Sequence, residues 1–259
     1  MEVKFVEINN ISKIYHTLDG ETVALDNISF NVDRGEIVSI VGPSGCGKST
    51  ILSIIAGLIQ PTSGKVFING ERTEGTDKNI GYMFQNDHLF QWRTIIDNVL
   101  IGLEIQKKLD TESIERVNKL LDTYGLKEFK YHYPNQLSGG MKQRVALIRT
   151  LAIEPELLLL DEPFSALDYQ SRLAVSDDIT GILKNEKKTA IMVTHDIAEA
   201  ISMSDRVLVL SKRPAYIKSI YDINLTCPDD DNTPLKCREA PEFRHYFNKI
   251  WKELDVYVE

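Results

Sequence analysis

The run Gly42-Pro-Ser-Gly-Cys-Gly-Lys48-Ser-Thr50 has the residue types and the spacing of a phosphate-binding loop. Its glycines allow the backbone to curl so that successive N–H groups point at phosphate oxygens, and a following helix adds its positive end. Lys48 can reach the terminal phosphates, and the Ser49 hydroxyl can ligate Mg²⁺. The predicted nucleotide-binding residues are Gly42, Pro43, Ser44, Gly45, Cys46, Gly47, Lys48, Ser49 and Thr50.

The segments on either side of this loop support the interpretation. Residues 36–41 read as a buried strand and residues 49–58 as a helix. A chance glycine turn would need neither, and it is the weaker alternative. A phosphate-binding loop alone is equally compatible with a kinase, a GTPase or a motor ATPase.

A second turn of the same chemical kind occurs at Leu137-Ser138-Gly139-Gly140-Met141. Ser138 can cap the helix predicted over residues 139–152, and the two glycines leave the first backbone N–H groups unobstructed. As a capping turn alone it would be unremarkable. In a chain that already carries a phosphate-binding loop, it predicts a second phosphate-binding site.

Polar side chains follow three of the predicted strands. Asp161 and Glu162 come after Leu157–Leu160, whose unbroken apolar run is typical of a strand buried on both faces. Gln85 and His195 end the strands predicted over residues 80–85 and 189–195. Open α/β sheets bind ligands at the carboxyl ends of their strands. Each side chain alone also has a structural explanation, such as a salt bridge or a helix start, but their joint occurrence favours a catalytic site.

The order of these motifs, with Ser165-Ala-Leu-Asp168 between Glu162 and His195, resembles the nucleotide-binding subunit of ATP-binding cassette (ABC) transporters over residues 3–211. The resemblance implies an α/β fold: a P-loop NTPase (RecA-like) core with an antiparallel β subdomain and an inserted α-helical subdomain. It also implies that two copies pair head to tail. Each ATP would then lie between Lys48 of one copy and Ser138, Gly139 and Gly140 of the other.

The resemblance further implies a role for each matching residue. Asp161 and Ser49 hold Mg²⁺, Glu162 acts as general base or polarises the attacking water, and His195 contacts the γ-phosphate. Gln85 senses Mg²⁺ and the water and links the site to a membrane partner. Tyr15, otherwise an ordinary strand aromatic, stacks on the purine ring, and Asp168 joins Ser138 and Gly140 at the dimer interface. The predicted catalytic residues are therefore Lys48, Gln85, Glu162 and His195.

One residue departs from the family pattern, because Met141 stands where the family most often has Gln. A similar departure occurs in the branch that resembles nitrate, sulfonate and taurine uptake systems. Residues 86–94 point to the same branch, as do Arg213-Pro214 and residues 238–243. Two alternatives remain for Leu89, Phe90 and Trp92: they line a groove for a helix of the membrane subunit, or they pack in the core.

The remaining chain is divided by composition and periodicity. Strands are expected over residues 3–15 and 24–32 with a turn at Asp19-Gly20, over 66–68, and over 206–211 as the last strand. Helices are expected over 94–107, 111–124, 169–186 and 196–204, with Gly125 ending the second of them. This divides the chain into an ABC nucleotide-binding domain over 1–211, with a helical subdomain over about 87–155, and a C-terminal extension over 212–259.

The extension is expected to hold a polar loop around Asp229–Asn232 and then a helix opened by Pro241. Phe243, Phe247, Ile250 and Leu254 share one face of that helix, for packing or for docking a partner. Three cysteines, one of them in the phosphate-binding loop, suggest a reducing compartment. Cys227 and Cys237 are accordingly expected to be two separate thiols rather than a metal or redox pair.

Bulk composition limits the partners. A hydrophobic content of 42% supports a sizeable core, and a formal net charge of −8 argues against nucleic acid. We find no apolar run of transmembrane length and no signal-peptide pattern, which predicts a cytoplasmic chain that could dock onto a membrane protein. Together with the resemblance, this implies a peripheral protein on the cytoplasmic face of the membrane.

Taken together, these features predict the ATP-hydrolysing subunit of an ABC importer for a small solute such as nitrate, sulfonate or taurine. ATP and Mg²⁺ are the expected cofactors, and a homodimer is expected when ATP is bound. Separate membrane permease subunits and an extracytoplasmic solute-binding protein are the expected partners. The alternatives are the ATPase of an ABC exporter, from which the catalytic residues do not distinguish it, and a soluble ABC ATPase outside transport. The solute itself is not encoded in this chain.

Overall fold

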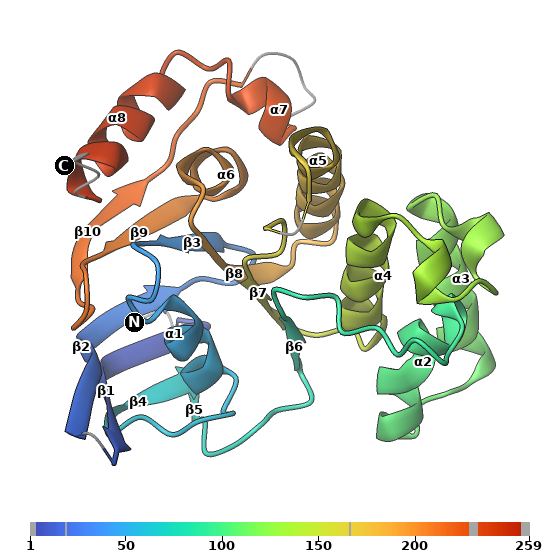
Figure 1. Ribbon diagram of the computed structural model, residues 1–259, viewed down its shortest axis with the longest axis horizontal. Coiled ribbons are helices and arrows are strands. Elements are labelled where there is room, and N and C mark those ends of the chain that lie inside the picture. Colours follow the sequence, from blue (N-terminus) through green and yellow to red (C-terminus); the bar gives the residue numbers. More distant parts are fainter. Residues whose placement is uncertain (1–3, 19, 166, 228–232, 255–259) are drawn as a thin grey trace. The chain divides into compact units, whose positions relative to one another are not determined.

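The computed structural model describes residues 4–254 except 19, 166 and 228–232 (Figure 1). It divides into two compact units. The first unit comprises residues 1–77 and 180–259, and the second comprises residues 78–179. Asp19 of the predicted turn, Ala166 and the polar stretch 228–232 lie outside the described residues. The predicted domain boundaries, at 211 and at about 87 and 155, stay predictions.

An antiparallel sheet in the first unit has the strand order β2-β1-β4-β5. Its strands are β1 (Val6–Thr17), β2 (Gly20–Val32), β4 (Ser63–Ile68) and β5 (Glu71–Arg72). β2 begins at Gly20, four residues before the predicted start at 24. The hydrophobic pattern missed these residues because the backbone pairing of Tyr15 with Thr22 and of His16 with Glu21 continues into polar, largely exposed sequence.

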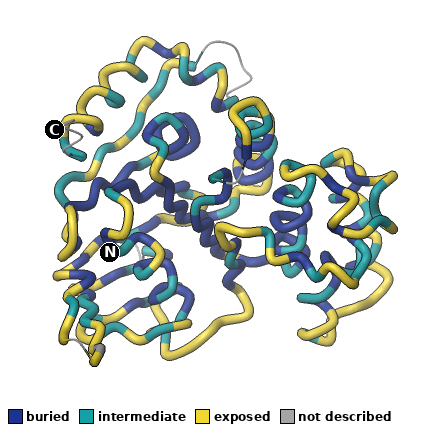
Figure 2. Tube along the Cα trace, in the orientation of Figure 1, coloured by how far each residue is buried: buried dark blue, intermediate teal, exposed yellow. Residues whose placement is uncertain are grey.

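The same unit contains a set of parallel strands. β3 (Ile37–Val41) lies between β8 (Thr189–Thr194) and β9 (Arg206–Leu210) and runs parallel to both. Every residue of β3 and β8 is buried, as the dark blue centre of this unit in Figure 2 shows. The predictions of strands over residues 36–41 and 189–195 are therefore confirmed, although each strand includes buried polar residues such as Ser39.

β9 is not the last strand, contrary to the prediction. β10 (Ile217–Asp222) pairs antiparallel with β9 at the edge. An edge strand has a weak sequence signal because it needs no buried face, and no residue of β10 is fully buried.

Two helices of the first unit begin directly after parallel strands. α1 (Lys48–Ile55) follows β3, and α6 (Ile197–Met203) follows β8, with the Asp196 side chain accepting the N–H groups of Ala198 and Glu199. α1 ends earlier than the predicted residue 58. Gly57 there has φ 70°, and a Cβ on it would lie 2.0 Å from the Gly75 carbonyl oxygen, so that only glycine fits this turn.

The C-terminal extension packs within the first unit. α8 (Phe243–Glu253) lies alongside α6 in Figure 1, and its Ile250 is fully buried there with Ile197, Ala200 and Ile201. Phe243, Phe247 and Leu254 pack against the same cluster, which confirms the predicted apolar face. At the far end of α8, Ser219 and Tyr221 of β10 donate hydrogen bonds to the Glu253 carboxylate.

Cys227 and Cys237 form a disulfide, so the prediction of two separate thiols is wrong. The short helix α7 (Pro234–Cys237), capped by the Thr233 hydroxyl, brings Cys237 back to the chain that leaves β10. The two Cα atoms are 4.6 Å apart, within the range that a disulfide spans. Composition could not reveal this disulfide, because two cysteines ten residues apart can pair only if the fold brings their Cα atoms close together.

The second unit holds the parallel pair β6 (Ile80–Met83) and β7 (Leu157–Asp161) and the helical region. Its longer helices are α2 (Ile95–Gln106), α3 (Thr111–Thr123) and α4 (Gly139–Ala152), close to their predicted bounds, and Gly125 (φ 69°) follows α3 as expected. Short 3₁₀ turns occur at Lys127–Phe129 and Pro134–Gln136. α5 (Tyr169–Asn185) spans the point at which the units divide.

The core of the helical region is formed by aliphatic side chains from α2, α3 and α4, including Val99, Leu103, Val117, Leu121, Val145 and Ile148. The predicted combination of parallel strands, an antiparallel sheet and a helical region is confirmed. Within the described part of the chain, no helix is both long and apolar enough to cross a membrane.

Packing of α8 can be tested at Ile250. Ile250→Ala removes a fully buried side chain from the contact with α6, and we expect it to lower the free energy of unfolding by about 2–4 kcal/mol. Ile105→Ala, at a side chain that is 74% exposed, is the matched control and should change it by less than about 0.5 kcal/mol. Thermal and denaturant unfolding measure both. Equal effects of the two substitutions would contradict the packing described here.

Candidate functional site

In the loop between β3 and α1, the Lys48 side chain turns back and contacts the backbone at the start of the loop. The Lys48 ammonium, only 5% exposed as a residue, donates to the carbonyl oxygens of Gly42 at 2.9 Å and of Pro43 at 3.1 Å. The cation is therefore held at the mouth of the loop by backbone acceptors. Such a loop can present N–H groups and one positive charge to a phosphate chain.

Two glycines of this loop are required by its close surroundings. Gly47 has φ 127°, and a Cβ on it would lie 2.7 Å from Leu25 Cδ2. A Cβ on Gly42 would lie 2.9 Å from the Cys46 sulfur. The tight turn thus depends on β2 packing against the loop as well as on the loop's own sequence.

Cys46 is the buried residue of the loop. Burial raises the pKa of its thiol above the ordinary value, and the nearby Lys48 charge only partly opposes this. The thiol therefore stays protonated at neutral pH, where it fills space beneath the loop and is not a reactive thiolate.

Two residues distant in sequence contact the loop. The Tyr15 hydroxyl of β1 lies 3.4 Å from the Thr50 hydroxyl, and the Tyr15 ring is 39% exposed. Arg213, which follows β9, donates to the Gly45 carbonyl from Nη2 at 2.8 Å and from Nε at 3.2 Å. The sequence identified Arg213 only as a resemblance to one branch of a family, and its contact with the loop was not predicted.

His195 is exposed at the end of β8. The residues beside it are fixed by hydrogen bonds: Thr194 donates to the buried Glu199 at 2.7 Å, and the Asp196 N–H donates to the Thr194 hydroxyl at 3.0 Å. The imidazole is thus presented from a rigid turn between a buried strand and a capped helix.

In the second unit, Asp161 and Glu162 end β7. Asp161 is 8% exposed and accepts a hydrogen bond from the Tyr82 hydroxyl at 3.3 Å. Glu162 has φ 46°, in the left-handed region that non-glycine residues seldom adopt. Its carbonyl accepts from the Ser165 N–H at 3.2 Å and from the Ser165 hydroxyl at 3.1 Å, which holds this sharp turn. Unusual backbone of this kind is concentrated at functional sites.

Gln85 contacts Glu162 directly. Its side-chain amide donates to the Glu162 carboxylate at 3.2 Å, and its backbone carbonyl accepts from Gln143 of α4 at 3.4 Å. The following turn is held by Arg149, which donates to the carbonyls of Asp87 at 2.6 Å and of His88 at 2.8 Å. Burial lowers the pKa of this guanidinium, yet an arginine remains charged at neutral pH.

Ser138, Gly139 and Gly140 form the N-terminus of α4. The Ser138 hydroxyl accepts the Met141 N–H at 3.3 Å, which confirms the predicted cap. A Cβ on either glycine would lie no closer than 3.7 Å to a neighbouring atom, an ordinary van der Waals contact. Both residues lie within a right-handed helix, where glycine is less stable than alanine by about 0.5–1 kcal/mol. Nothing in the described chain therefore requires glycine here, which suggests that a ligand or partner approaches this turn closely.

Asp168 has a local role in the structure. Its carboxylate accepts the N–H groups of Gln170 and Ser171, each at 3.1 Å, at the start of α5. Hydrogen bonds from Ser171 hold the pKa of this carboxyl below its ordinary value. A contact across a dimer stays a prediction.

The predicted cluster of Leu89, Phe90 and Trp92 is split between the two alternatives. Leu89 is buried in the core of the helical region, whereas Trp92 is 74% exposed and packs against the half-buried Phe90 at 5.1 Å between ring centroids. The buried Asn98 holds this segment, because it accepts the Phe90 N–H at 2.7 Å and donates to the Phe90 carbonyl at 3.1 Å.

Each unit thus brings together part of the predicted site. The first unit combines the phosphate-binding loop, Tyr15 and His195, and the second combines Gln85, Asp161, Glu162 and the Ser138 turn. Sequence reasoning missed the supporting residues Tyr82, Gln143, Arg149 and Arg213, whose roles depend on contacts between distant segments. No group of three or more His, Cys, Asp or Glu side chains suited to a metal occurs among the described residues. Ser49 in the first unit and Asp161 in the second carry hydroxyl and carboxylate oxygens, the donor types that Mg²⁺ prefers, and their role as ligands stays a prediction.

Comparison with known proteins extends over nearly the whole chain. A protein-family model described as ABC transporter matches residues 25–165. An uncharacterized ABC transporter ATP-binding protein of Bacillus subtilis, YtlC, is 45% identical over 98% of this chain and 96% of its own length. The nitrate import ATP-binding protein NrtD of Synechocystis is 41% identical over 95% and 93%, and the aliphatic sulfonates import ATP-binding protein SsuB of Bacillus anthracis is 38% identical over 93% and 96%.

A solved structure is similar as well. It is an ATP-binding cassette described as dimeric, in a post-hydrolysis state bound to ADP and Pi. It matches with a TM-score of 0.74 and 34% identity, over 85% of this chain and 99% of that one.

A functional role of the two glycines in the Ser138 turn can be distinguished from an effect on fold stability. We expect Gly139→Ala and Gly140→Ala to raise the free energy of unfolding by about 0.5–1 kcal/mol each and to lower ATP hydrolysis by about 10-fold or more, because a methyl group blocks close approach to the helix N-terminus. Gly181→Ala in α5, where no atom lies within 4 Å of the new Cβ, is the matched control. It should stabilise the chain similarly and leave hydrolysis unchanged. Undiminished hydrolysis in both turn variants would show that nothing approaches these glycines.

Proposed function

Because the chain belongs to the ABC transporter family and is an ATPase of that family, we propose that it is the ATP-hydrolysing subunit of an importer for a small anionic or zwitterionic solute such as nitrate, a sulfonate or taurine. Its fold is that of an ABC cassette, as predicted. The subunit would lie on the cytoplasmic face of a membrane and work with separate permease subunits and an external solute-binding protein.

The observation that carries the import assignment is the extent of the similarity. The family model ends at residue 165, whereas the nitrate and sulfonate import proteins match 93% or more of the chain. The similarity therefore reaches beyond the catalytic motifs, which importers and exporters have in common, into the extension that packs on α6.

In the chemistry we propose, each of the two units supplies different groups. The backbone of residues 42–50 and the Lys48 ammonium bind the phosphates, and Tyr15 stacks on the purine. Tyr15 is suited to this because its ring is partly exposed while its hydroxyl reaches Thr50 at the loop. His195 contacts the γ-phosphate from its rigid turn.

Glu162 is proposed to act on the attacking water. The side-chain amide of Gln85 holds its carboxylate, and the left-handed turn held by Ser165 fixes its backbone. A carboxylate placed in this way can accept a proton or align a water molecule for attack on the γ-phosphate. Gln85 in turn connects to α4 through Gln143, so that a movement of the Ser138 turn would reach Glu162 through hydrogen bonds.

ATP is the substrate, and Mg²⁺ is its proposed companion. Ser49 and Asp161 offer a hydroxyl and a carboxylate, the hard oxygen donors that Mg²⁺ prefers, and the remaining ligands would be phosphate and water oxygens. When bound, the ion would neutralise charge on the phosphates. The Tyr82 hydroxyl would orient Asp161 for this role.

A head-to-tail dimer is the proposed working unit. Among the residues that the structure describes, none gives the glycines of the Ser138 turn a steric or conformational explanation, and the turn offers N–H groups and a hydroxyl. A second phosphate-binding turn of this kind is explained if it completes the ATP site of another copy. The exposed Trp92 and the half-buried Phe90 packed against it are the proposed contact with a permease subunit.

Trapping the ATP-bound dimer tests the shared site. Glu162→Gln should slow hydrolysis by about 100-fold or more, because the amide cannot take the proton, while ATP binding persists. With Mg-ATP this variant should elute from size-exclusion chromatography as a dimer. Adding Ser138→Arg to Glu162→Gln places a bulky side chain at the turn, and the double variant should bind ATP but elute as a monomer. A double variant that still dimerises would refute the role of this turn.

Import is tested by the partners of the chain. When the subunit is expressed together with membrane proteins encoded next to it, it should copurify with a permease. That permease should stimulate ATP hydrolysis only when a solute-binding protein with bound solute is present. Ligands of that binding protein can be screened by thermal shift, because a ligand specific for the folded state raises the unfolding temperature. Copurification with an exporter-type membrane protein, or stimulation independent of any binding protein, would refute import.

A further inference from the structure

We propose that Cys227 and Cys237 are a reversible thiol–disulfide site, which in its oxidised state fastens the C-terminal extension against α6. The substrate of this site is a dithiol reductant or its disulfide. The inference rests on the proposed function in one respect: a subunit that meets ATP beside a membrane works where thiols are ordinarily kept reduced. A disulfide in such a place is more often redox-active than purely structural.

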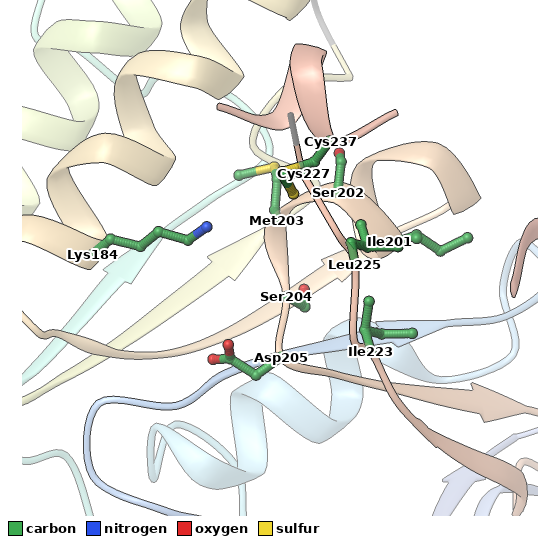
Figure 3. A pocket seen from close by; sticks show the side chains of 10 residues that line it. All are labelled: Lys184, Ile201, Ser202, Met203, Ser204, Asp205, Ile223, Leu225, Cys227 and Cys237. Atoms are coloured by element: carbon green, nitrogen blue, oxygen red, sulfur yellow. A yellow bond between two sulfur atoms is a disulfide. The ribbon is translucent and has the colours of Figure 1, made fainter. Parts of the chain in front are cut away.

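The bond is reachable from outside. Both cysteines line a cavity of about 150 Å³, together with residues 201–205 at the end of α6 and Ile223 and Leu225 after β10. Figure 3 shows the disulfide at one end of this cavity, beside Met203, and the Lys184 side chain reaching toward it from α5. Cys227 is the more exposed of the two, whereas Cys237 is 2% exposed. A thiolate from solution can therefore approach the disulfide through this cavity on the Cys227 side.

The reaction balances as an ordinary exchange. A thiolate of the reductant attacks Cys227 Sγ, forming a mixed disulfide and releasing Cys237 as a thiolate. The second thiol of the reductant, as its thiolate, then attacks its own sulfur in the mixed disulfide and releases Cys227. Two electrons pass to the protein, two protons are taken up at its cysteines, and the reductant leaves as a disulfide.

The cross-link lies where it controls the extension. It is the covalent tie between α7 and the chain after β10, and α7 packs against α6 as α8 does. The adjoining contacts are weaker. Thr226 donates from its N–H and its hydroxyl to Glu242 at the start of α8, at 3.1 and 3.0 Å, and these hydrogen bonds hold the pKa of the Glu242 carboxyl below its usual value. The Glu242 side of this contact is only partly buried, so these hydrogen bonds contribute too little to replace the disulfide.

The C-terminal end of α8 is held by contacts that do not involve the disulfide. Ile250 is buried against α6, and Glu253 is bonded by β10. Reduction should therefore loosen α7 and the first turn of α8, where Phe243 and Tyr246 still pack against the same apolar cluster, more than the last turn, which holds the buried Ile250. This graded response distinguishes a redox-controlled attachment from general unfolding.

The test follows the full chain in glutathione buffers from fully reduced to fully oxidised. Differential alkylation and mass spectrometry measure each cysteine, with the free, buried Cys46 as the internal reference. Cys227 and Cys237 should titrate together, with a slope for two electrons. Hydrogen exchange of α7 and the first turn of α8 should quicken by about 10-fold or more on reduction, because closure of the ten-residue loop no longer restrains them. Exchange in α1 should not change.

Cys227→Ser, Cys237→Ser and the double variant should all reproduce the reduced exchange pattern and lose its dependence on the buffer. A disulfide that persists in the fully reduced buffer would be a structural bond and would overturn the proposal. Two thiols that persist in the fully oxidised buffer, or reduction that leaves α7 exchange unchanged, would overturn it as well. None of these measurements uses ATP hydrolysis, so failure here and failure of the proposed function are distinguishable.

Discussion

The structure depends first on a tight backbone turn between the buried strand β3 and the helix α1. Gly47 adopts φ 127° with Leu25 of β2 directly against it, and Arg213 holds the Gly45 carbonyl from the far side of β9. Lys48 completes the turn by donating to the carbonyls where the loop begins. A phosphate-binding loop is thus a local sequence whose shape is maintained by two distant segments, and the antiparallel sheet and the chain after β9 are parts of the nucleotide site in that sense.

The second unit fixes the backbone and the carboxylate of one residue at the end of a buried strand. Glu162 lies on a left-handed turn, is held by Gln85, and is connected through Gln143 to the helix that Ser138 caps. The two glycines of that cap lower helix stability without an internal benefit, which is understandable if their benefit is realised only with another molecule. A short series of hydrogen bonds therefore connects the two residues that the proposed function assigns to catalysis and to pairing, Glu162 and Ser138.

The C-terminal extension is joined to this machinery through α6. That helix begins directly after His195 and Asp196, and its apolar face is shared with α8. Apolar packing along α8 and a disulfide at α7 both secure the extension. An attachment that is partly covalent and partly hydrophobic can respond to redox conditions at one end without losing its place at the other.

The sequence by itself determined what is local. Glycine spacing identified the phosphate-binding loop, unbroken leucines identified β7, and capping residues placed α2, α3 and α4 within one or two residues. These signals are strong because the backbone conformation and the burial of each residue directly limit which residue types can occupy that position. Only the tertiary structure decided which distant groups support them: Arg213 on Gly45, Tyr82 on Asp161, Gln143 on Gln85, and Cys227 bonded to Cys237. β10 was missed for the same reason, because an edge strand is specified by its neighbour's unpaired backbone and leaves little periodicity of its own.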